Sequence, residues 1–134
     1  THLERVDLST CTKLTEIGEL SFWDCTRLTY IDLSACTKLT KIEERAFQNC
    51  KSLGSVDLYP CTALTLIGYA AFESCRFAVV KLPESITQLG IQAFGSYNSY
   101  CGKVKIKGGS EYNRIYALVT GSPCNYPAAF IEQY

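Results

Sequence analysis

The chain has 134 residues, of which 47% are hydrophobic, and its 13 basic residues balance 13 acidic ones. This length and composition suit one domain with a real apolar core and argue against a disordered chain. A formal charge of zero gives no general attraction to nucleic acid or anionic membrane, and no apolar run is long enough to span a bilayer. Methionine is absent, so we expect the native chain to begin upstream of Thr1. No signal-peptide pattern is visible at the start of this sequence.

The first part of the chain is a repeat of about 25 residues. The segment CTKLT occurs at 11–15 and again at 36–40, and CTALT follows at 61–65. Successive lines begin at Leu3, Leu28, Leu53 and Phe77, with a degenerate fifth near Lys103. The alternation in VDL, IDL and VKIK predicts one short strand per line, and strands from successive lines would stack in parallel. No single line can bury its apolar face, so the stacked lines predict a solenoid with a shared core.

Apolar residues that recur at the same place in each line form the predicted core. The columns are Val6, Ile31, Val56, Val80 and Val104; Leu8, Leu33, Leu58, Leu82 and Ile106; Leu14, Leu39, Leu64 and Ile86; Ile17, Ile42, Ile67 and Leu89; and Phe22, Phe47, Phe72 and Phe94. We expect the Phe column to form an aromatic ladder along the return limbs, the segments that lead from one strand to the next.

Each line opens L-x-x-[VI]-x-L-x-x-C-x-x-L and continues I-x-x-x-x-F-x-x-C-x-x-L, as in IEERAFQNCKSL and IGYAAFESCRFA. The pattern resembles the BspA-type leucine-rich repeats of bacterial surface proteins, well over residues 3–94 and loosely over 101–108. The resemblance implies an α/β-type solenoid over residues 1–108, an arc of about four to five coils. A short parallel sheet would form its concave face, and the return limbs would be mostly irregular or short-helical. Residues 109–134 would be an aromatic-rich cap or tail.

The eight cysteines admit three interpretations: a metal site, a disulfide framework, or equivalent positions in a stacked core. Two columns, Cys11, Cys36 and Cys61, and Cys25, Cys50 and Cys75, repeat with the period of the lines. Adjacent members would have Cβ atoms about 5 Å apart, beyond the roughly 3.5–4.5 Å of a disulfide. The chain has no closely spaced cysteine pair of the zinc-binding kind, so we expect structural thiols and no metal. Outside both columns, Cys101 and Cys124 either form one disulfide that pins the tail or stay reduced.

The strand residues that face away from the core give the candidate partner-binding surface. It consists of Arg5, Asp7, Tyr30, Asp32, Ser55, Asp57, Tyr59, Val79, Lys81, Lys103 and Lys105. Its middle column is acidic in the first three lines and basic in the next two. Neighbouring carboxylates repel each other, and the fold offers no evident need for them. They are open to three interpretations: a cation site, for which a flat ladder supplies too few oxygens; a patch for a partner with basic residues; or a solvated face.

The two ends of the solenoid need covers. The first strand begins at about Leu3, which leaves no room for a cap, so we expect upstream sequence or another subunit to cover that edge. At the other end, Tyr112, Ile115, Tyr116, Leu118 and Val119 are the residues that we expect to close the last coil. The final segment, 126–134, would pack back or reach a neighbour, which leaves a homo-oligomer open.

These features point to a non-enzymatic module that binds another protein. The chain has no phosphate-binding glycine loop, no usable histidine and no nucleophile beside a base, so we expect no catalysis and no cofactor. The resemblance implies an extracytoplasmic protein, in the periplasm, at the cell surface or secreted, that acts in adhesion to host or matrix proteins and in virulence. A self-assembling structural module and an intracellular leucine-rich repeat adaptor are the alternatives.

Overall fold

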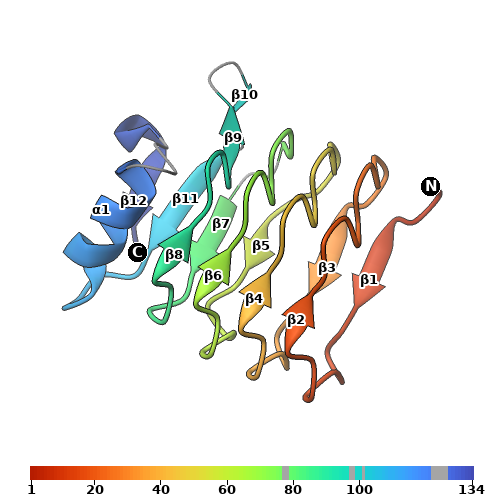
Figure 1. The fold of residues 1–134 in the computed structure, drawn as a ribbon, viewed down its shortest axis with the longest axis horizontal. Coiled ribbons are helices and arrows are strands. Elements are labelled where there is room, and N and C mark those ends of the chain that lie inside the picture. Colours follow the sequence, from red (N-terminus) through yellow and green to blue (C-terminus); the bar gives the residue numbers. More distant parts are fainter. Residues whose placement is uncertain (77–78, 97–98, 101, 122–126) are drawn as a thin grey trace.

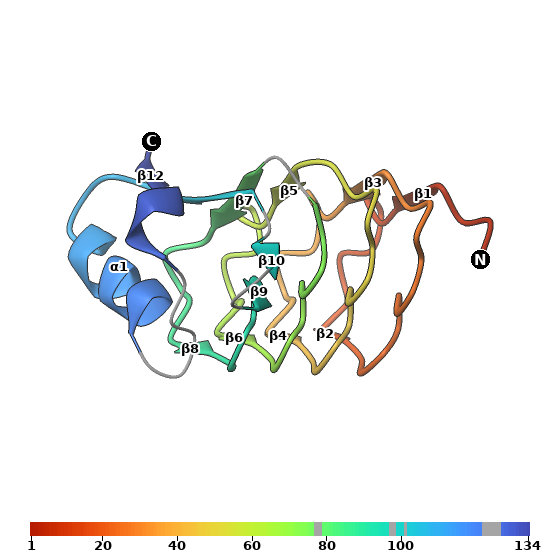
Figure 2. The same ribbon diagram turned by 90° about the horizontal axis from the view of Figure 1, so that it is seen from above.

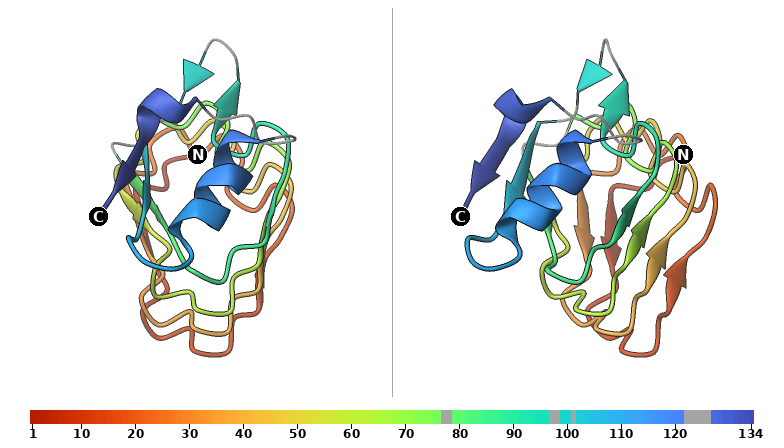
Figure 3. Two further views of the ribbon diagram at one scale, coloured as in Figure 1. Left: turned by 90° about the vertical axis from the view of Figure 1, so that its left-hand side faces the viewer. Right: turned by 60° about the vertical axis from the view of Figure 1, so that its left-hand side comes forward.

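The structure is a computed structural model, which describes residues 1–76, 79–96, 99–100, 102–121 and 127–134. The chain winds into flattened coils that stack along one axis (Figures 1 and 2). Each coil runs along one broad side, turns, and returns along the opposite side, which is plain in the end-on view of Figure 3. A solenoid was the expectation, and the structure confirms it.

One broad side is built from parallel strands, all but the last of which lie in the alternating segments that predicted a strand; the last lies in a segment where no strand was expected. They are β1 (Arg5–Asp7), β3 (Tyr30–Asp32), β5 (Val56–Asp57), β7 (Val79–Leu82), β11 (Lys103–Ile106) and β12 (Ile131–Gln133). β1 pairs with β3, and β5, β7, β11 and β12 form a second, continuous set, with every pairing in these two sets parallel. The register keeps the core columns together, with Val6 opposite Ile31 and Val80 opposite both Val56 and Val104. We call this side the front face.

The return limbs carry a second parallel ladder. Its two-residue strands are β2 (Glu16–Ile17), β4 (Lys41–Ile42), β6 (Leu66–Ile67) and β8 (Gln88–Leu89). Mostly irregular or short-helical limbs were expected, and the limbs are indeed mainly turns; the ladder is an addition that the repeat pattern did not indicate. It forms because the stacked coils bring the same backbone groups opposite each other, even across the last step, which is 22 residues rather than 25. A short antiparallel pair, β9 (Gly95–Ser96) and β10 (Ser99–Tyr100), projects beyond the stack (Figure 1).

The core lies between the front face and the second ladder. The predicted columns are buried from the second coil onward, including Leu28, Ile31 and Leu39. The predicted aromatic ladder is confirmed, with ring centroids 5.0 Å apart for Phe22–Phe47, 5.1 Å for Phe47–Phe72 and 6.1 Å for Phe72–Phe94. The first coil is the exception, because Val6, Leu8, Leu14 and Phe22 only pack partly buried against this core. Phe77 lies outside the described residues.

Two positions in the turns have a left-handed backbone in successive coils. Leu20, Arg45, Ala70 and Gln92 have φ between 50° and 58°, and Asp24, Asn49 and Ser74 have φ between 56° and 65°. The conformation aims a backbone N–H at the next coil: Arg45 donates to Tyr69 C=O at 2.9 Å, and Ala70 to Ile91 C=O at 2.9 Å. These bonds hold the turns in register, and they offset the strain of a left-handed residue that is not glycine.

A row of side chains links three coils on the outside of the turns. Trp23 Nε1–H donates to Gln48 Oε1 at 3.1 Å, and Gln48 Nε2–H donates to Glu73 Oε2 at 2.5 Å. Because the residues are 25 apart, each comes from a different coil. We call these three residues the turn row.

The helix α1 (Tyr112–Thr120) lies across the open end of the last coil (Figure 3). Ile115 and Val119 are buried beneath it, and Tyr112, Tyr116 and Leu118 pack on the core. The Arg114 guanidinium donates to Ile86 C=O at 2.6 Å and to Glu84 C=O at 2.8 Å, which ties the helix to the preceding coil. After η1 (Ala128–Phe130) the chain returns to the front face as β12, in register with β11.

At the opposite end of the stack, the first coil leaves large apolar side chains in contact with solvent. Leu3, Leu20 and Trp23 are 39%, 44% and 51% exposed. Within the described part of the chain, no helix has the length and apolar character needed to cross a membrane.

Candidate functional site

The acidic column of the front face belongs to the turn structure. Asp7 Oδ1 accepts the Ser9 N–H at 2.9 Å, Asp32 Oδ1 accepts the Ser34 N–H at 2.9 Å, and Asp57 Oδ1 accepts the Tyr59 N–H at 3.0 Å. Each carboxylate therefore satisfies a backbone donor just after its strand, which is how aspartate starts many turns. The expectation that the fold offers no need for these aspartates was wrong.

These hydrogen bonds keep the first two carboxylates charged. Bonds from Ser9 and Ser34 lower the pKa values of Asp7 and Asp32 below the ordinary 3.8. Asp32 Oδ2 also accepts the Tyr30 hydroxyl at 3.1 Å, and this bond raises the pKa of Tyr30. Asp7 and Asp32 are opposite each other in the register of β1 and β3. Two ionised carboxylates thus lie side by side on the front face.

The basic half of the front face is largely paired within the chain. Lys81 Nζ lies 3.5 Å from Asp57, and Lys105 Nζ lies 3.6 Å from Glu132, which also bonds Lys103. The Lys103 ammonium lowers the pKa of Glu132. Glu132 belongs to β12, and the sequence analysis missed it as a residue of this face. The only signal was the alternation in FIEQY, and this segment is too short to predict a strand or its register.

Tyr59 and Lys107 also contact neighbouring side chains of the same chain. The Lys107 ammonium contacts the Tyr59 hydroxyl and lies 3.7 Å from Glu84. The Tyr59 ring meets the Tyr134 ring edge to face, with centroids 6.1 Å apart. Burial raises the pKa of Tyr134 to about 12. Tyr59 is therefore part of the packing of the C-terminal segment.

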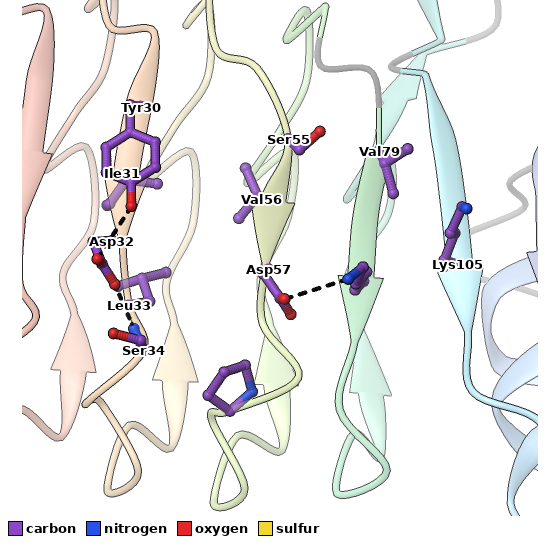
Figure 4. A pocket seen from close by; sticks show the side chains of 12 residues that line it. Tyr30, Ile31, Asp32, Leu33, Ser34, Ser55, Val56, Asp57, Val79 and Lys105 are labelled. Carbon is purple, nitrogen blue, oxygen red and sulfur yellow. Dashed lines mark hydrogen bonds and ion pairs between the residues drawn. The ribbon is translucent and has the colours of Figure 1, made fainter. Parts of the chain in front are cut away.

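A groove of about 500 Å³ lies on the front face over β3, β5 and β7 (Figure 4). Of the residues proposed from the sequence, it is lined by Tyr30, Asp32, Ser55, Asp57, Val79, Lys81 and Lys105. Arg5, Asp7, Tyr59 and Lys103 do not line it. Ser34 and Pro60 also line the groove and were not in the proposed set. The groove gathers charged, hydroxyl and aromatic groups from neighbouring coils, which is the composition of a polar protein-binding surface.

The aromatic side chain beside the groove already holds a cation. The Arg5 guanidinium lies over the Tyr30 ring, 4.4 Å from its centroid. Tyr30 is 37% exposed, so part of its surface remains open to solvent. An exposed ring that accepts a guanidinium is a common anchor at protein interfaces.

The cysteine columns lie inside the stack. The thiols of Cys50 and Cys75 donate to Phe22 C=O at 3.1 Å and to Phe47 C=O at 2.9 Å, in each case a carbonyl of the preceding coil. Cys36 and Cys61 make longer contacts of the same kind, 3.8 Å from Leu8 C=O and Leu33 C=O. Cys25 is buried and Cys11 is half-buried.

Burial of these thiols opposes their ionisation. Burial raises the pKa of Cys61 to about 12 and also raises the pKa of Cys36. A hydrogen bond with the Cys75 thiol, together with burial, raises the pKa of Cys50 strongly. A protonated, enclosed thiol is a poor nucleophile and a poor metal ligand. In the described ranges, no three histidine, cysteine or acidic side chains gather as metal ligands, and Cys101 and Cys124 lie outside those ranges.

Comparison with protein families agrees with this architecture. The BspA type leucine-rich repeat region matches residues 1–114 in six copies. No curated protein and no solved structure matches the chain. The match covers most of the chain and coincides with the coils whose strands, core columns and thiols are described above. The protein belongs to the BspA-type leucine-rich repeat family.

Proposed function

We propose that this protein is a non-enzymatic protein-binding module whose partner contacts the front face. The family is one of interaction modules, which supports a protein partner. The observation that carries the proposal is the groove over β3, β5 and β7, where side chains of four coils, including Lys105 of β11, converge on one surface. A solenoid presents such a surface at low cost, because the stacked coils hold it rigid before a partner arrives.

The partner that we propose is an extracellular-matrix or host protein, with the chain acting as an adhesin-like protein outside the bacterial cytoplasm. The common surface association of the family supports this location. Asp7 and Asp32 provide adjacent negative charges that form no ion pair among the described residues, and Tyr30 provides an exposed ring. A basic surface on the partner would complement them and would speed association.

Binding to immobilised matrix proteins tests this proposal. The purified chain is passed over fibronectin, collagen, laminin and fibrinogen surfaces beside a variant with Asp7, Asp32 and Asp57 changed to Asn. Asparagine keeps the side-chain oxygen that accepts the turn N–H, so the variant should fold while the charge is lost. We expect saturable binding that weakens at least tenfold in the variant. The absence of binding by the folded chain, or equal binding by the variant, would contradict the proposal for these partners.

Self-assembly is a second candidate because the first coil exposes Leu3, Leu20 and Trp23 at one end of the stack. Another copy of the chain could cover this end and bury the half-exposed residues. Sedimentation velocity over a hundredfold range of concentration would distinguish the two. A shift to a dimer that is lost on Leu20→Ser plus Trp23→Ser supports assembly, and a constant monomer contradicts it.

A further inference from the structure

The parallel ladder of the front face is interrupted between β3 and β5. Across β1 and β3, the Leu8 N–H donates to Asp32 C=O at 3.0 Å. The equivalent bond from Leu33 N–H to Asp57 C=O is not made, and no strand pairing joins β3 to β5 in the described residues. The groove lies over this interruption, since residues of both β3 and β5 line it, and Figure 4 shows their side chains.

Among the described residues, the interruption leaves the side of β3 that faces β5 without a paired strand. The Asp32 C=O points to β1, and neighbouring residues of a strand present their backbone groups to opposite sides. The Ile31 C=O and the Leu33 N–H therefore point toward β5, and both residues line the groove. Unpaired backbone groups at a partly covered site favour a ligand that can hydrogen-bond them.

The charges that line the groove leave one negative charge without a partner. Of the four charged residues, Asp57 pairs with Lys81 at 3.5 Å, and Lys105 pairs with Glu132 at 3.6 Å. Asp32 has no ion-pair partner within the part of the chain that is described. Its carboxylate is held in place by the Ser34 N–H and the Tyr30 hydroxyl, and each oxygen keeps a further lone pair. The site is therefore complementary to a cation.

We propose that the groove receives the guanidinium of an arginine side chain on an extended segment of the partner protein. This inference rests on the proposed protein-binding function and names the chemistry of that site. A guanidinium carries five N–H donors in one plane, so it can bond the Asp32 carboxylate and the Ile31 carbonyl together. An ammonium has no such planar arrangement. Tyr30 forms one wall, and Arg5 shows that its ring accepts a guanidinium.

An NMR titration with the whole chain tests the proposal. The probe is the blocked peptide acetyl-Gly-Ser-Arg-Ser-Gly-amide, compared with peptides that carry citrulline or lysine in place of arginine. Citrulline keeps the shape of arginine without its charge. We expect the arginine peptide to shift the amide signals of Ile31, Leu33 and Asp57. We expect the citrulline peptide to bind at least tenfold more weakly, and the lysine peptide at least threefold more weakly.

A matched pair of variants separates the groove from general charge. Asp32→Asn and Asp7→Asn remove the same charge, and both keep the oxygen that accepts a serine N–H, but only Asp32 lines the groove. We expect Asp32→Asn to weaken the arginine peptide at least fivefold and Asp7→Asn less than twofold. Equal weakening, equal binding of citrulline or lysine, or shifts confined to residues that do not line the groove would overturn the proposal.

The two proposals can fail separately. Suppose that the peptide does not bind, but that a matrix protein binds the unchanged chain and does not bind the triple asparagine variant. The front face then binds a partner, and the arginine site is wrong. If the peptide binds in the groove while no matrix protein binds, the arginine site stands and the choice of matrix partner is wrong.

Discussion

Cys50 shows how a single residue serves the stack. Its thiol donates to Phe22 C=O at 3.1 Å and is enclosed by two neighbouring coils. Cys11, in the first coil and in the other cysteine column, is only half-buried. The same residue type therefore contributes differently at different places in the array.

This difference leads to a prediction about stability. Cys50→Ala removes a buried sulfur and its hydrogen bond, so we expect a loss of about 1–2 kcal/mol in the free energy of unfolding. Cys11→Ala, a control in the other cysteine column, should cost less than about 0.5 kcal/mol because this thiol is only half-buried. Urea unfolding followed by circular dichroism measures both. Equal losses would show that burial in the stack is not the reason.

The turns are the elements in which the sequence was least informative. Leu20, Arg45, Ala70 and Gln92 share a left-handed backbone without a glycine among them, so no residue type marked the conformation. The stacking of the coils, and the backbone hydrogen bonds between them, impose it. The two-residue strands of the second ladder escaped prediction for a similar reason, since two residues cannot display a period.

Leu20 gives a test of this strain. Its φ is 58° and its side chain is 44% exposed, so a glycine would relieve the backbone and lose little packing. We expect Leu20→Gly to raise the free energy of unfolding by about 0.5–1 kcal/mol, since the relief exceeds the added freedom of the unfolded chain. Leu20→Ala keeps the Cβ and should give no gain. A glycine variant less stable than the alanine variant would contradict the account.

At the scale of the whole molecule, repetition explains why most of the fold was predictable. The columns of Val, Leu, Ile and Phe recur once per coil, and this recurrence is enough to predict which side chains are buried. The interruption between β3 and β5 could not be predicted, because Asp32 and Asp57 stand at the same place in the repeat and each is followed by L-x-x-C. The pairing of Glu132 with the lysines of β11 was also hidden, because it joins the array to a segment that does not repeat.

The C-terminal helix is the part of the whole whose attachment can be tested alone. Arg114→Ala removes the guanidinium bonds to Ile86 C=O and Glu84 C=O, so α1 should open more often while the coils remain closed. Hydrogen exchange should become about tenfold faster for the amides of α1, with those of β4 and β6 unchanged. Asn113→Ala, an exposed neighbour in the same helix, is the control.

Faster exchange throughout the chain would contradict this view and would make α1 part of one cooperative unit with the coils.

The turn row has a consequence for how near-identical coils find their order. Trp23 can only donate, Gln48 both accepts and donates, and Glu73 as a carboxylate can only accept. The three side chains therefore form a hydrogen-bonded series with a fixed direction, from Trp23 through Gln48 to Glu73. A chain that skipped a coil would place Trp23 beside Glu73 and leave Gln48 outside. The apolar columns are alike in each coil, but the three residues of the turn row differ and so distinguish one coil from the next.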